Sequence, residues 1–263
     1  MSAIYNEIGV NYDTTRNADP RIVHKLAELA EIEPNKKYLD IACGTGNYTI
    51  ELSKCGGEWF GFDQSEKMLH EAKLKTNTIT WSCFDVAKLD YDDEKFDGAI
   101  CSLAIHHFSN LSLALIEIAR VLKPNSKLVI FTSTPEQMQN YWLIEYFPEM
   151  MKKSCKQMPS ILSIKNASAA STLKIVAVEP FFIEPNLKDF FLYSGKFRPS
   201  IYLSKNVRDG ISSFINFCSK SELKSGLANL EADIESGKIN ATPINDNLGD
   251  YMFITLKKQS NRR

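Results

Sequence analysis

Apolar residues along the first half of the chain recur at two spacings, and their alternation predicts strands separated by helices. Ile22, Val23, Leu26 and Leu29 repeat at helical spacing directly after Asp19-Pro20, which is a typical helix start. Short apolar runs predict strands over residues 37–42, 58–63, 78–83, 96–103 and 127–132. Strands that alternate with helices are typical of a parallel sheet with right-handed crossovers.

The second half of the chain predicts fewer strands and longer connections. Residues 173–183 and 251–256 have the pattern of two more strands, and Pro180 favours an edge or a bulge for the first of them. Residues 113–122 are apolar on nearly all sides, which predicts a buried helix that stops at Pro124. We therefore expect an α/β protein with one sheet and two long insertions.

The two insertions are the segments about 135–170 and 186–239, and both are rich in aromatic residues. Connections of this length in compact domains are commonly lids or binding segments, so we expect them to cover a substrate. The same aromatic and Met stripes also fit ordinary core packing. We predict a single domain over residues 1–263, whose core is about 19–134, 172–184 and 249–258.

Composition is that of a globular protein with a large core. The 263 residues are 44% hydrophobic and 24% charged, and the net charge is −1. No long run of Lys or Arg is present, which argues against nucleic-acid binding. No leader-like segment opens the chain and no run of about 18 uncharged apolar residues occurs, so we expect a cytoplasmic protein without membrane insertion.

Cysteine and histidine spacing gives no indication of a metal site. The six cysteines form no Cys-X-X-Cys pair and lie mostly in apolar patterns, so we expect buried free thiols. Among the four histidines only His106 and His107 are close in sequence, and adjacent side chains point apart on a strand or a helix. We predict no bound metal.

The strongest signal for function is a glycine-rich turn that follows the first strand. Gly44 and Gly46 allow a sharp turn against which a ligand can lie, and Asp63 ends the next strand 17 residues after Gly46. This spacing is typical of a carboxylate that binds the ribose hydroxyls of a nucleotide. Asp40 and Thr49 depart from the dinucleotide pattern, so an NAD(P)-dependent oxidoreductase remains only the alternative.

Six ordered motifs resemble those of class I S-adenosylmethionine-dependent methyltransferases, most closely the branch of the ubiquinone and menaquinone biosynthesis methyltransferases. They are Leu39-Asp-Ile-Ala-Cys-Gly-Thr-Gly46, Gly61-Phe-Asp-Gln-Ser-Glu-Lys-Met68, Phe84-Asp-Val86, Phe96-Asp-Gly-Ala99, Leu103-Ala-Ile-His-His-Phe108 and Ala119-Arg-Val-Leu-Lys-Pro124. The resemblance covers about residues 10–135. It departs at Ala42, where many members have Gly.

The resemblance implies a Rossmann-like seven-stranded sheet, mostly parallel, with helices on both faces, an antiparallel last strand and helical lid insertions. It also implies the cofactor S-adenosylmethionine, which leaves as S-adenosylhomocysteine. Carried over by motif, the cofactor-binding residues would be Asp40, Ala42, Gly44, Gly46, Asp63, Gln64, Met68, Asp85, Val86, Ser102 and Leu103. Asp63 would bind the ribose and Asp85 the adenine edge, although each acid also fits a helix cap.

Methyl transfer is an in-line displacement that needs a base only when the acceptor carries a proton. His106 and His107 follow the fourth strand, where similar enzymes use a histidine as base or orienter, and Tyr12 is the preferred partner. Loop anchoring is the alternative role for the histidines, and simple packing is the alternative for Tyr12.

For the acceptor we expect a small molecule with an anionic or strongly polar group. The candidate substrate-binding residues are Tyr5, Arg16, Trp142, Tyr193, Lys196, Arg198 and Arg208, because basic residues there interleave with rings. A solvated basic face is the alternative. A silent S-adenosylmethionine-binding module also stays open, as do the methylated atom and the oligomeric state. Ser102-Leu-Ala-Ile105 replaces the Asn-Pro-Pro-Tyr type of motif expected for nucleic-acid or glutamine methylation.

Overall fold

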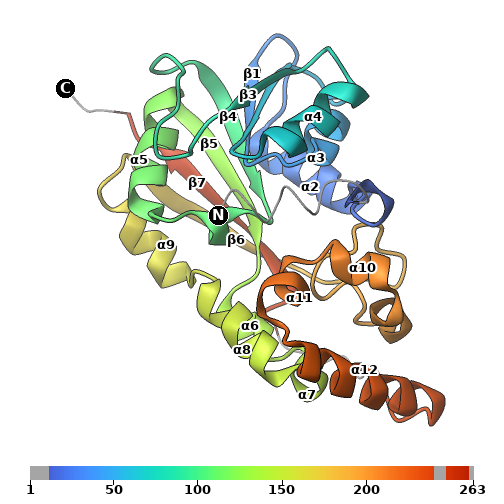
Figure 1. Ribbon diagram of the computed structural model, residues 1–263. Helices are drawn as coiled ribbons and strands as arrows, with labels where there is room; N and C mark the ends of the chain where they lie inside the picture. Colours follow the sequence, from blue (N-terminus) through green and yellow to red (C-terminus); the bar gives the residue numbers. More distant parts are fainter. Residues whose placement is uncertain (1–11, 240–246, 261–263) are drawn as a thin grey trace.

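The computed structural model describes residues 12–239 and 247–260 of the chain. Seven strands form one sheet in the order β3-β2-β1-β4-β5-β7-β6 (Figure 1). The strands are β1 (Lys37–Ile41), β2 (Glu58–Asp63), β3 (Thr80–Cys83), β4 (Phe96–Ser102), β5 (Leu122–Thr132), β6 (Leu173–Phe181) and β7 (Tyr251–Lys258). The strands predicted from the apolar runs are therefore confirmed, and so is the sheet.

Strands β1 to β5 pair in parallel, whereas β7 pairs antiparallel with both β5 and β6. The chain leaves β1 toward β2 on one side and later returns to place β4 on the other side of β1. Such a reversal of strand order opens a crevice at the carboxyl ends of the two strands, where open α/β sheets bind their ligands. The topology thus places a site beyond the ends of β1 and β4.

Helices cover both faces of the sheet, as predicted. In Figure 1, α2 (Pro20–Ala30), α3 (Asn47–Ser53) and α4 (Glu66–Lys75) lie to one side, and α5 (Leu111–Val121) and α9 (Ile161–Ser168) lie to the other. Helix α2 begins at the predicted place, where the Asp19 side chain accepts a hydrogen bond from the N–H of Arg21. Two buried apolar clusters, one on each face, hold these layers together.

Two local predictions need correction. Leu113 is 50% exposed and Ile116 is 37% exposed, so α5 is buried on one face only, because no further element covers the other face among the described residues. The chain also enters β5 at Leu122, five residues earlier than predicted, because Leu122 already pairs with Phe96 before a register shift. Pro180 does lie in an edge strand, as expected, since β6 pairs only with β7.

The two insertions pack on one another beyond the carboxyl ends of the parallel strands (Figure 1). We call residues 135–158 and 186–235 the lid. Its helices are α6 (Pro135–Met138), α7 (Leu143–Tyr146), α8 (Pro148–Gln157), η3 (Pro199–Leu203), α10 (Lys205–Asp209), α11 (Ser212–Phe217) and α12 (Lys220–Glu235). Helix α8 contacts α11, and α7 contacts α12, so segments far apart in sequence form one unit.

Helix α9 corrects the predicted extent of the first insertion. It falls within the predicted segment 135–170, yet it packs against α5 and β6 on a face of the sheet. Ile164 is fully buried in the same apolar cluster as Leu115 and Ile118 of α5.

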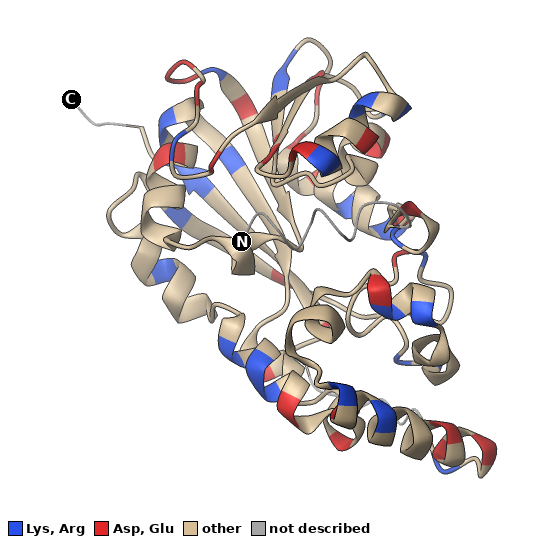
Figure 2. Cartoon of the chain, in the orientation of Figure 1, with Lys and Arg blue, Asp and Glu red and all other residues tan. Residues whose placement is uncertain are grey.

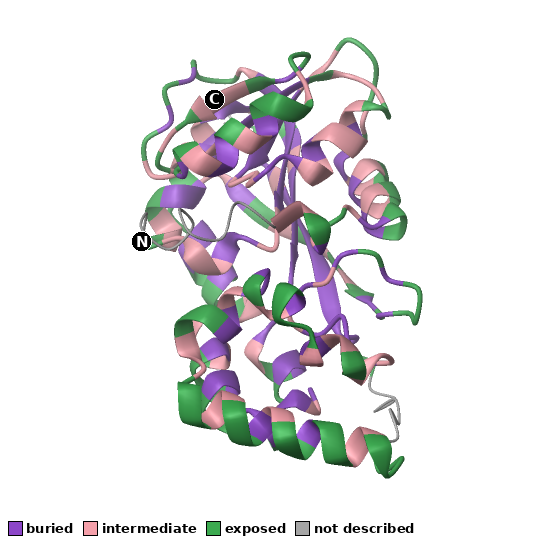
Figure 3. Ribbon diagram, turned by 45° about the vertical axis from the view of Figure 1, so that its right-hand side comes forward, coloured by how far each residue is buried: buried purple, intermediate pink, exposed green. Residues whose placement is uncertain are grey.

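In Figure 3 the lid helices are buried along the side that meets the rest of the molecule and exposed along the other. An amphipathic lid helix therefore has both a core face and a solvent face.

Candidate functional site

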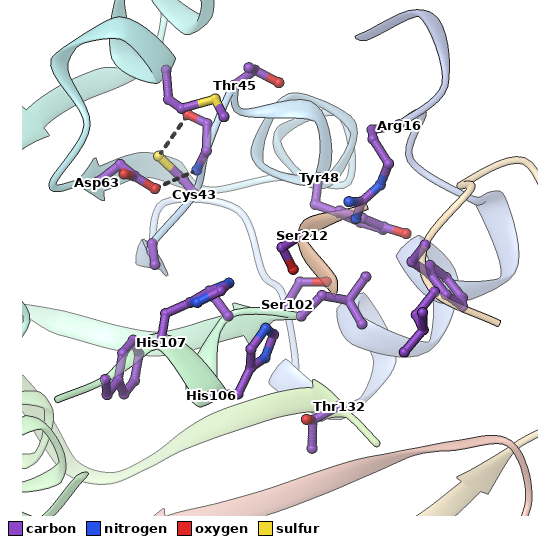
Figure 4. Close-up of a pocket in the computed structure, with 18 of the residues that line it drawn as sticks. Arg16, Cys43, Thr45, Tyr48, Asp63, Ser102, His106, His107, Thr132 and Ser212 are labelled. Atoms are coloured by element: carbon purple, nitrogen blue, oxygen red, sulfur yellow. Dashed lines mark hydrogen bonds between the residues drawn. The ribbon is translucent and has the colours of Figure 1, made fainter. Parts of the chain in front are cut away.

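A cavity of about 1700 Å³, including its open mouth, lies between the carboxyl ends of the parallel strands and the lid. Its walls come from the turns after β1, β2, β3, β4 and β5, and from lid residues that Figure 4 shows in part. The cavity lies at the place that the strand order indicates.

The glycine-rich turn after β1 forms one wall of the cavity. Gly44 has a φ of +56°, and a Cβ added there would meet no heavy atom within 4 Å. Gly46 has a φ of +76°, and a Cβ there would come to 2.4 Å from the Trp81 ring. Gly44 therefore keeps open space for a ligand, whereas Gly46 is required by the packing of the protein itself. Ala42 has a φ of +55°, in the left-handed region that favours glycine.

Asp63 is held at the end of β2 with its carboxylate against the glycine-rich turn. The N–H of Gly44 donates to Oδ2 at 2.9 Å (Figure 4), and the N–H of Ser65 donates to Oδ1 at 2.8 Å. Ser65, rather than Asp63, caps α4, because its side chain accepts from the N–H of Met68. Burial raises the pKa of Asp63, and the two backbone donors oppose that rise.

Asp40 lies deeper, at the end of β1, and is only 2% exposed. Its Oδ2 accepts a hydrogen bond of 2.5 Å from Thr49 Oγ1 at the start of α3. Burial raises the pKa of Asp40 to about 7, with a smaller contribution from the charge of Asp63, while the Thr49 hydrogen bond lowers it. Thr49 therefore has a partner of its own in this fold, which explains why the turn does without a third glycine.

All eleven predicted cofactor-binding residues except Gly46 line the cavity. Asp85 also holds its own turn, since its Oδ1 accepts from the N–H of Ala87 at 2.8 Å. Ser102 Oγ is buried without a hydrogen-bond partner among the described residues. Leu103 has a φ of +55°, so the strand ends of β1 and β4 each continue into a strained, left-handed residue at the cavity.

His106 and His107 lie in the 3₁₀ turn η2 (Ile105–His107) after β4, and both line the cavity (Figure 4). Burial is the main cause that holds the pKa of His106 well below its usual value, and the charges of His107 and Arg16 add to it. Burial alone lowers the pKa of His107 to about 4. His106 Nδ1 is buried and has no partner among residues 12–239 and 247–260. Both rings are therefore neutral at pH 7.

Tyr12 and Arg16 belong to a short segment that closes one side of the cavity. Arg16 Nε donates to Asp189 Oδ1 at 2.6 Å, and its Nη1 donates to the carbonyl of Gly210 at 3.0 Å. The Arg16 guanidinium also lies 5.0 Å from the centre of the Tyr12 ring. Both residues line the cavity, but Arg16 already has a carboxylate partner. Tyr5, predicted beside them, lies outside the described residues.

The same segment is attached to the core by Asp13. Its Oδ1 accepts from Thr45 Oγ1 at 2.6 Å and from Asn47 Nδ2 at 2.8 Å, and its Oδ2 pairs with Lys75 at 2.5 Å. Residues 12–16 therefore connect the glycine-rich turn, through Asp13, with Asp189 of the lid, through Arg16. No motif in the sequence indicated Asp13 or Asp189, since their partners lie up to 173 residues away.

The other predicted substrate-binding residues are not brought to the cavity. Lys196 is buried and its Nζ lies 2.7 Å from Asp250 Oδ1, so its charge is used within the protein. Arg198 donates to the carbonyl of Leu187 and Arg208 to that of Tyr202. Trp142 and Tyr193 pack inside the lid, against Tyr202 and Tyr141 respectively, and do not line the cavity either. These five are packing residues of the lid in this structure, which is the alternative reading of the aromatic and basic stripe.

The lid instead presents to the cavity a set of uncharged residues that sequence reasoning missed. They are Met138, Ser154, Gln157, Met158, Phe191, Leu192, Ile211, Ser212 and Ser213, and Thr132 and Ser133 at the end of β5 join them. The polar run Thr132-Ser-Thr134 at the end of a predicted strand could have indicated Thr132 and Ser133, because the carboxyl ends of the strands face the site. Nothing in the sequence indicated that Gln157 and Ser212 would line the cavity.

Among the described residues, no group of three or more His, Cys, Asp and Glu side chains is placed to hold a metal ion. None of the described helices has the length and apolar character needed to cross a membrane. All six cysteines are free, but only Cys101 is buried. Cys55 and Cys83 are exposed because they lie just after α3 and at the end of the edge strand β3.

Residues 39–130 match the family model described as "Methyltransferase domain". A demethylmenaquinone methyltransferase of Staphylococcus carnosus (strain TM300) is 33% identical over 144 residues, which cover 50% of this chain and 60% of that relative. The solved structure of a putative methyltransferase from an antibiotic biosynthesis pathway of Anabaena variabilis ATCC 29413 is 28% identical. It superposes with a TM-score of 0.82 over 91% of this chain and 98% of that one.

A second solved structure, that of geranyl diphosphate C-methyltransferase from Streptomyces coelicolor A3(2), shares the fold. Its identity is 10% and its TM-score 0.57, over 90% of this chain and 77% of that one, and it holds S-adenosylhomocysteine, Mg²⁺ and geranyl diphosphate. The chain thus matches 60% of the length of the Staphylococcus relative in sequence, and nearly all of the Anabaena protein in structure.

Proposed function

From the match of residues 39–130 to a methyltransferase family model and the superposition on the Anabaena structure, we propose that this chain is a class I S-adenosylmethionine-dependent methyltransferase. It transfers the methyl group of this cofactor to a small molecule held under the lid. The observation that carries the proposal is the shared cavity. One wall is formed by the strand ends and turns that carry Asp40, Asp63 and Asp85, and the opposite wall is formed by the lid. A donor and an acceptor can therefore meet inside one enclosed space.

The residues of the cavity fit S-adenosylmethionine, whose sulfonium and ammonium groups are cationic. The open space at Gly44 lets a ligand lie against the turn. Asp40, Asp63 and Asp85 give this wall a negative character, and Ser102 Oγ is a buried polar atom with no partner among the described residues. We assign Asp63 to the ribose hydroxyls, Asp85 to the adenine edge and Asp40 to the methionine end.

When bound, the cofactor supplies an activated methyl group, so the task of the protein is to position the acceptor and exclude water. The lid and residues 12–16 enclose the cavity and do the latter. His106 is neutral at pH 7 and can accept a hydrogen bond from an acceptor hydroxyl. Its low pKa makes it a weak base, so we assign it an orienting role and propose Tyr12, which also lines the cavity, as its partner.

We further propose that the enzyme works in the cytoplasm, where the six free thiols would stay reduced. The relatives named demethylmenaquinone methyltransferases suggest a quinol as the first acceptor to test. Liberation of S-adenosylhomocysteine in the presence of a reduced naphthoquinone would identify it as a substrate.

Calorimetry on Asp63→Ala tests the cofactor assignment. We expect the variant to lose about 10- to 150-fold in affinity for S-adenosylmethionine, since hydrogen bonds to a charged group contribute about 1.5–3 kcal/mol. Asp90→Ala, which removes a carboxylate from outside the cavity, is the matched control and should bind like the wild type. Unchanged affinity in Asp63→Ala would refute the assignment, and tight binding of NADH would favour an oxidoreductase instead.

A further inference from the structure

The charges around the cavity are distributed unevenly between its two walls. Four carboxylates line it, and Arg16 is the only Lys or Arg among the described residues that does. Arg16 is paired with Asp189, so its charge is already compensated within the protein. Asp40, Asp63 and Asp85 belong to the part of the lining formed by residues 40–103, which we call the cofactor wall. The fourth carboxylate is that of Asp189. An anionic acceptor would therefore meet negative potential and no available cation.

A second part of the cavity lining comes from the lid and the end of β5, and we call it the lid wall. Its one charged residue among the described residues is Asp189, whose charge is compensated by Arg16. The residues from α6, α8 and α11, and those that end β5, are Ser, Thr, Gln, Gly, Met and Ile. Figure 2 shows charged residues on α8 and α12, which are Lys and Glu on α8 and Lys, Asp and Glu on α12, but these residues are absent from the cavity lining. A cationic acceptor thus meets no unpaired carboxylate on this wall either. Burying an unpaired charge costs far more than burying a hydrogen-bonded neutral group.

Two hydroxyl groups on the lid wall are already used inside the protein. Thr132 Oγ1 donates to the carbonyl of Ser133 at 3.1 Å, and Ser154 Oγ donates to the carbonyl of Met150 at 2.9 Å. Gln157, at the end of α8, and Ser212, at the start of α11, make no side-chain hydrogen bond to another described residue. Because α8 packs against α11, these two polar groups belong to the same wall.

From this arrangement we propose that the methyl acceptor is an uncharged molecule with hydroxyl or carbonyl groups, and that Gln157 and Ser212 determine this specificity. The inference rests on the proposed methyl transfer and replaces the anionic acceptor expected from the sequence. Gln157 offers both a donor and an acceptor, and Ser212 offers a hydroxyl, so together they can bind either a hydroxyl or a carbonyl oxygen.

The apolar residues of the same wall indicate the shape of the acceptor. Met138, Met158, Phe191, Leu192 and Ile211 line the cavity around the two polar groups. Small-molecule sites with apolar linings and a few polar groups bury an apolar scaffold and fix its orientation through the polar ones. Met side chains adapt to flat or irregular surfaces. An acceptor with a ring system and a few oxygen atoms fits this wall.

The test compares neutral and anionic forms of the same ring. The enzyme is saturated with S-adenosylhomocysteine and titrated with 1,4-dihydroxy-2-naphthoic acid, with its methyl ester, and with 4-hydroxybenzoate and its methyl ester. We expect each ester to bind at least about tenfold more tightly than its acid, as measured by calorimetry. Equal affinities within both pairs, tighter binding of the acids, or no measurable binding of either ester would overturn the proposal.

Two substitutions locate the effect at Gln157. Gln157→Ala should weaken ester binding about five- to thirtyfold, and Gln157→Lys should shift the preference at least about tenfold toward the acids, because it introduces the missing cation. Gln139→Lys makes the same change at an exposed position outside the cavity and is the control. If Gln157→Lys shifts the preference no more than Gln139→Lys does, Gln157 does not determine specificity.

S-adenosylhomocysteine affinity separates this inference from the proposed function. All three variants should bind S-adenosylhomocysteine as the wild type does, since neither Gln157 nor Gln139 belongs to the cofactor wall. A wild-type protein that fails to bind S-adenosylhomocysteine would refute the methyltransferase proposal itself. Normal cofactor binding without a preference for esters would refute only the neutral acceptor.

Discussion

The two walls of the cavity differ in how the chain builds them. The cofactor wall comes from one stretch, residues 40–103, in which each strand delivers its terminal residues directly to the site. The lid wall is assembled from four separate places, around residues 132–138, 154–158, 189–192 and 210–213. The first wall therefore depends on local sequence, and the second depends on how distant helices pack.

The walls also use charged residues for different purposes. On the cofactor wall, Asp40 and Asp63 direct their charges to the cavity or to the turn that lines it. Within the lid, Lys196 pairs with Asp250, and Arg198 and Arg208 donate to backbone carbonyls. The charged residues of the lid are thus paired within the protein, including Asp189 at the cavity, and the residues left to contact a ligand are uncharged. This contrast generates the predictions below, from the largest expected effect to the smallest.

Lys196→Met should cause the largest loss of stability, because the charge of Lys196 is used inside the lid rather than for a ligand. The substitution leaves Asp250 buried with its charge uncompensated, which typically costs about 3–5 kcal/mol of unfolding free energy. Urea denaturation measures the loss. Lys205→Met removes the cation of an exposed pair with Asp209 and should cost about 0–1 kcal/mol. A stable Lys196→Met protein with a raised KM for acceptor would return Lys196 to the substrate site.

The sequence was sufficient to predict the fold and most of the cofactor wall, because both are encoded at short range. Apolar runs locate the strands, and strand ends of a parallel sheet meet at one edge, so Asp40, Asp63 and Asp85 could be placed near one another without a structure. Even the cap of α4 at Ser65 follows from its position before the helix. Here each residue's role depends on neighbours within a few positions.

The lid wall could not be predicted in the same way, because its contacts join residues that are far apart. Arg16 lies 173 positions from its partner Asp189, and Lys196 lies 54 positions from Asp250. A run of aromatic and basic residues does not reveal which side chains face inward. The burial of Lys196 and the exposure of Leu113 were both missed, since each depends on which elements cover that surface.

The pH dependence of cofactor affinity tests the role assigned to Asp40, and its expected effect is smaller. Because the pKa of Asp40 is about 7 in the empty protein, the carboxyl is mostly protonated below pH 7 and mostly charged above it. A cationic cofactor prefers the charged form, so affinity for S-adenosylmethionine should fall by up to about tenfold per pH unit below 7 and level off above it. Calorimetry between pH 5.5 and 8.5 measures this.

Asp40→Asn is the matched control for the pH dependence. It keeps the shape of the side chain but cannot ionise, so its affinity should be lower above pH 7 and should change little across the range. If the wild-type affinity were equally flat, Asp40 would not face the cationic part of the cofactor, and the assignment of the methionine end would be wrong.

Ala42→Gly should have the smallest effect, and it concerns strain in the turn of the cofactor wall. Ala42 has a φ of +55°, which costs a residue with a Cβ about 1–2 kcal/mol. Glycine removes that cost but loses about 0.5–1 kcal/mol through the greater freedom of the unfolded chain. The difference predicts a gain of about 0–1.5 kcal/mol in unfolding free energy, which thermal denaturation would detect as a rise in Tm. Asn125→Gly, at a φ of +68° outside the cavity, should gain less, because Asn tolerates this conformation. A fall in Tm for Ala42→Gly would show that the turn is not strained at this residue, and that its methyl group contributes to packing instead.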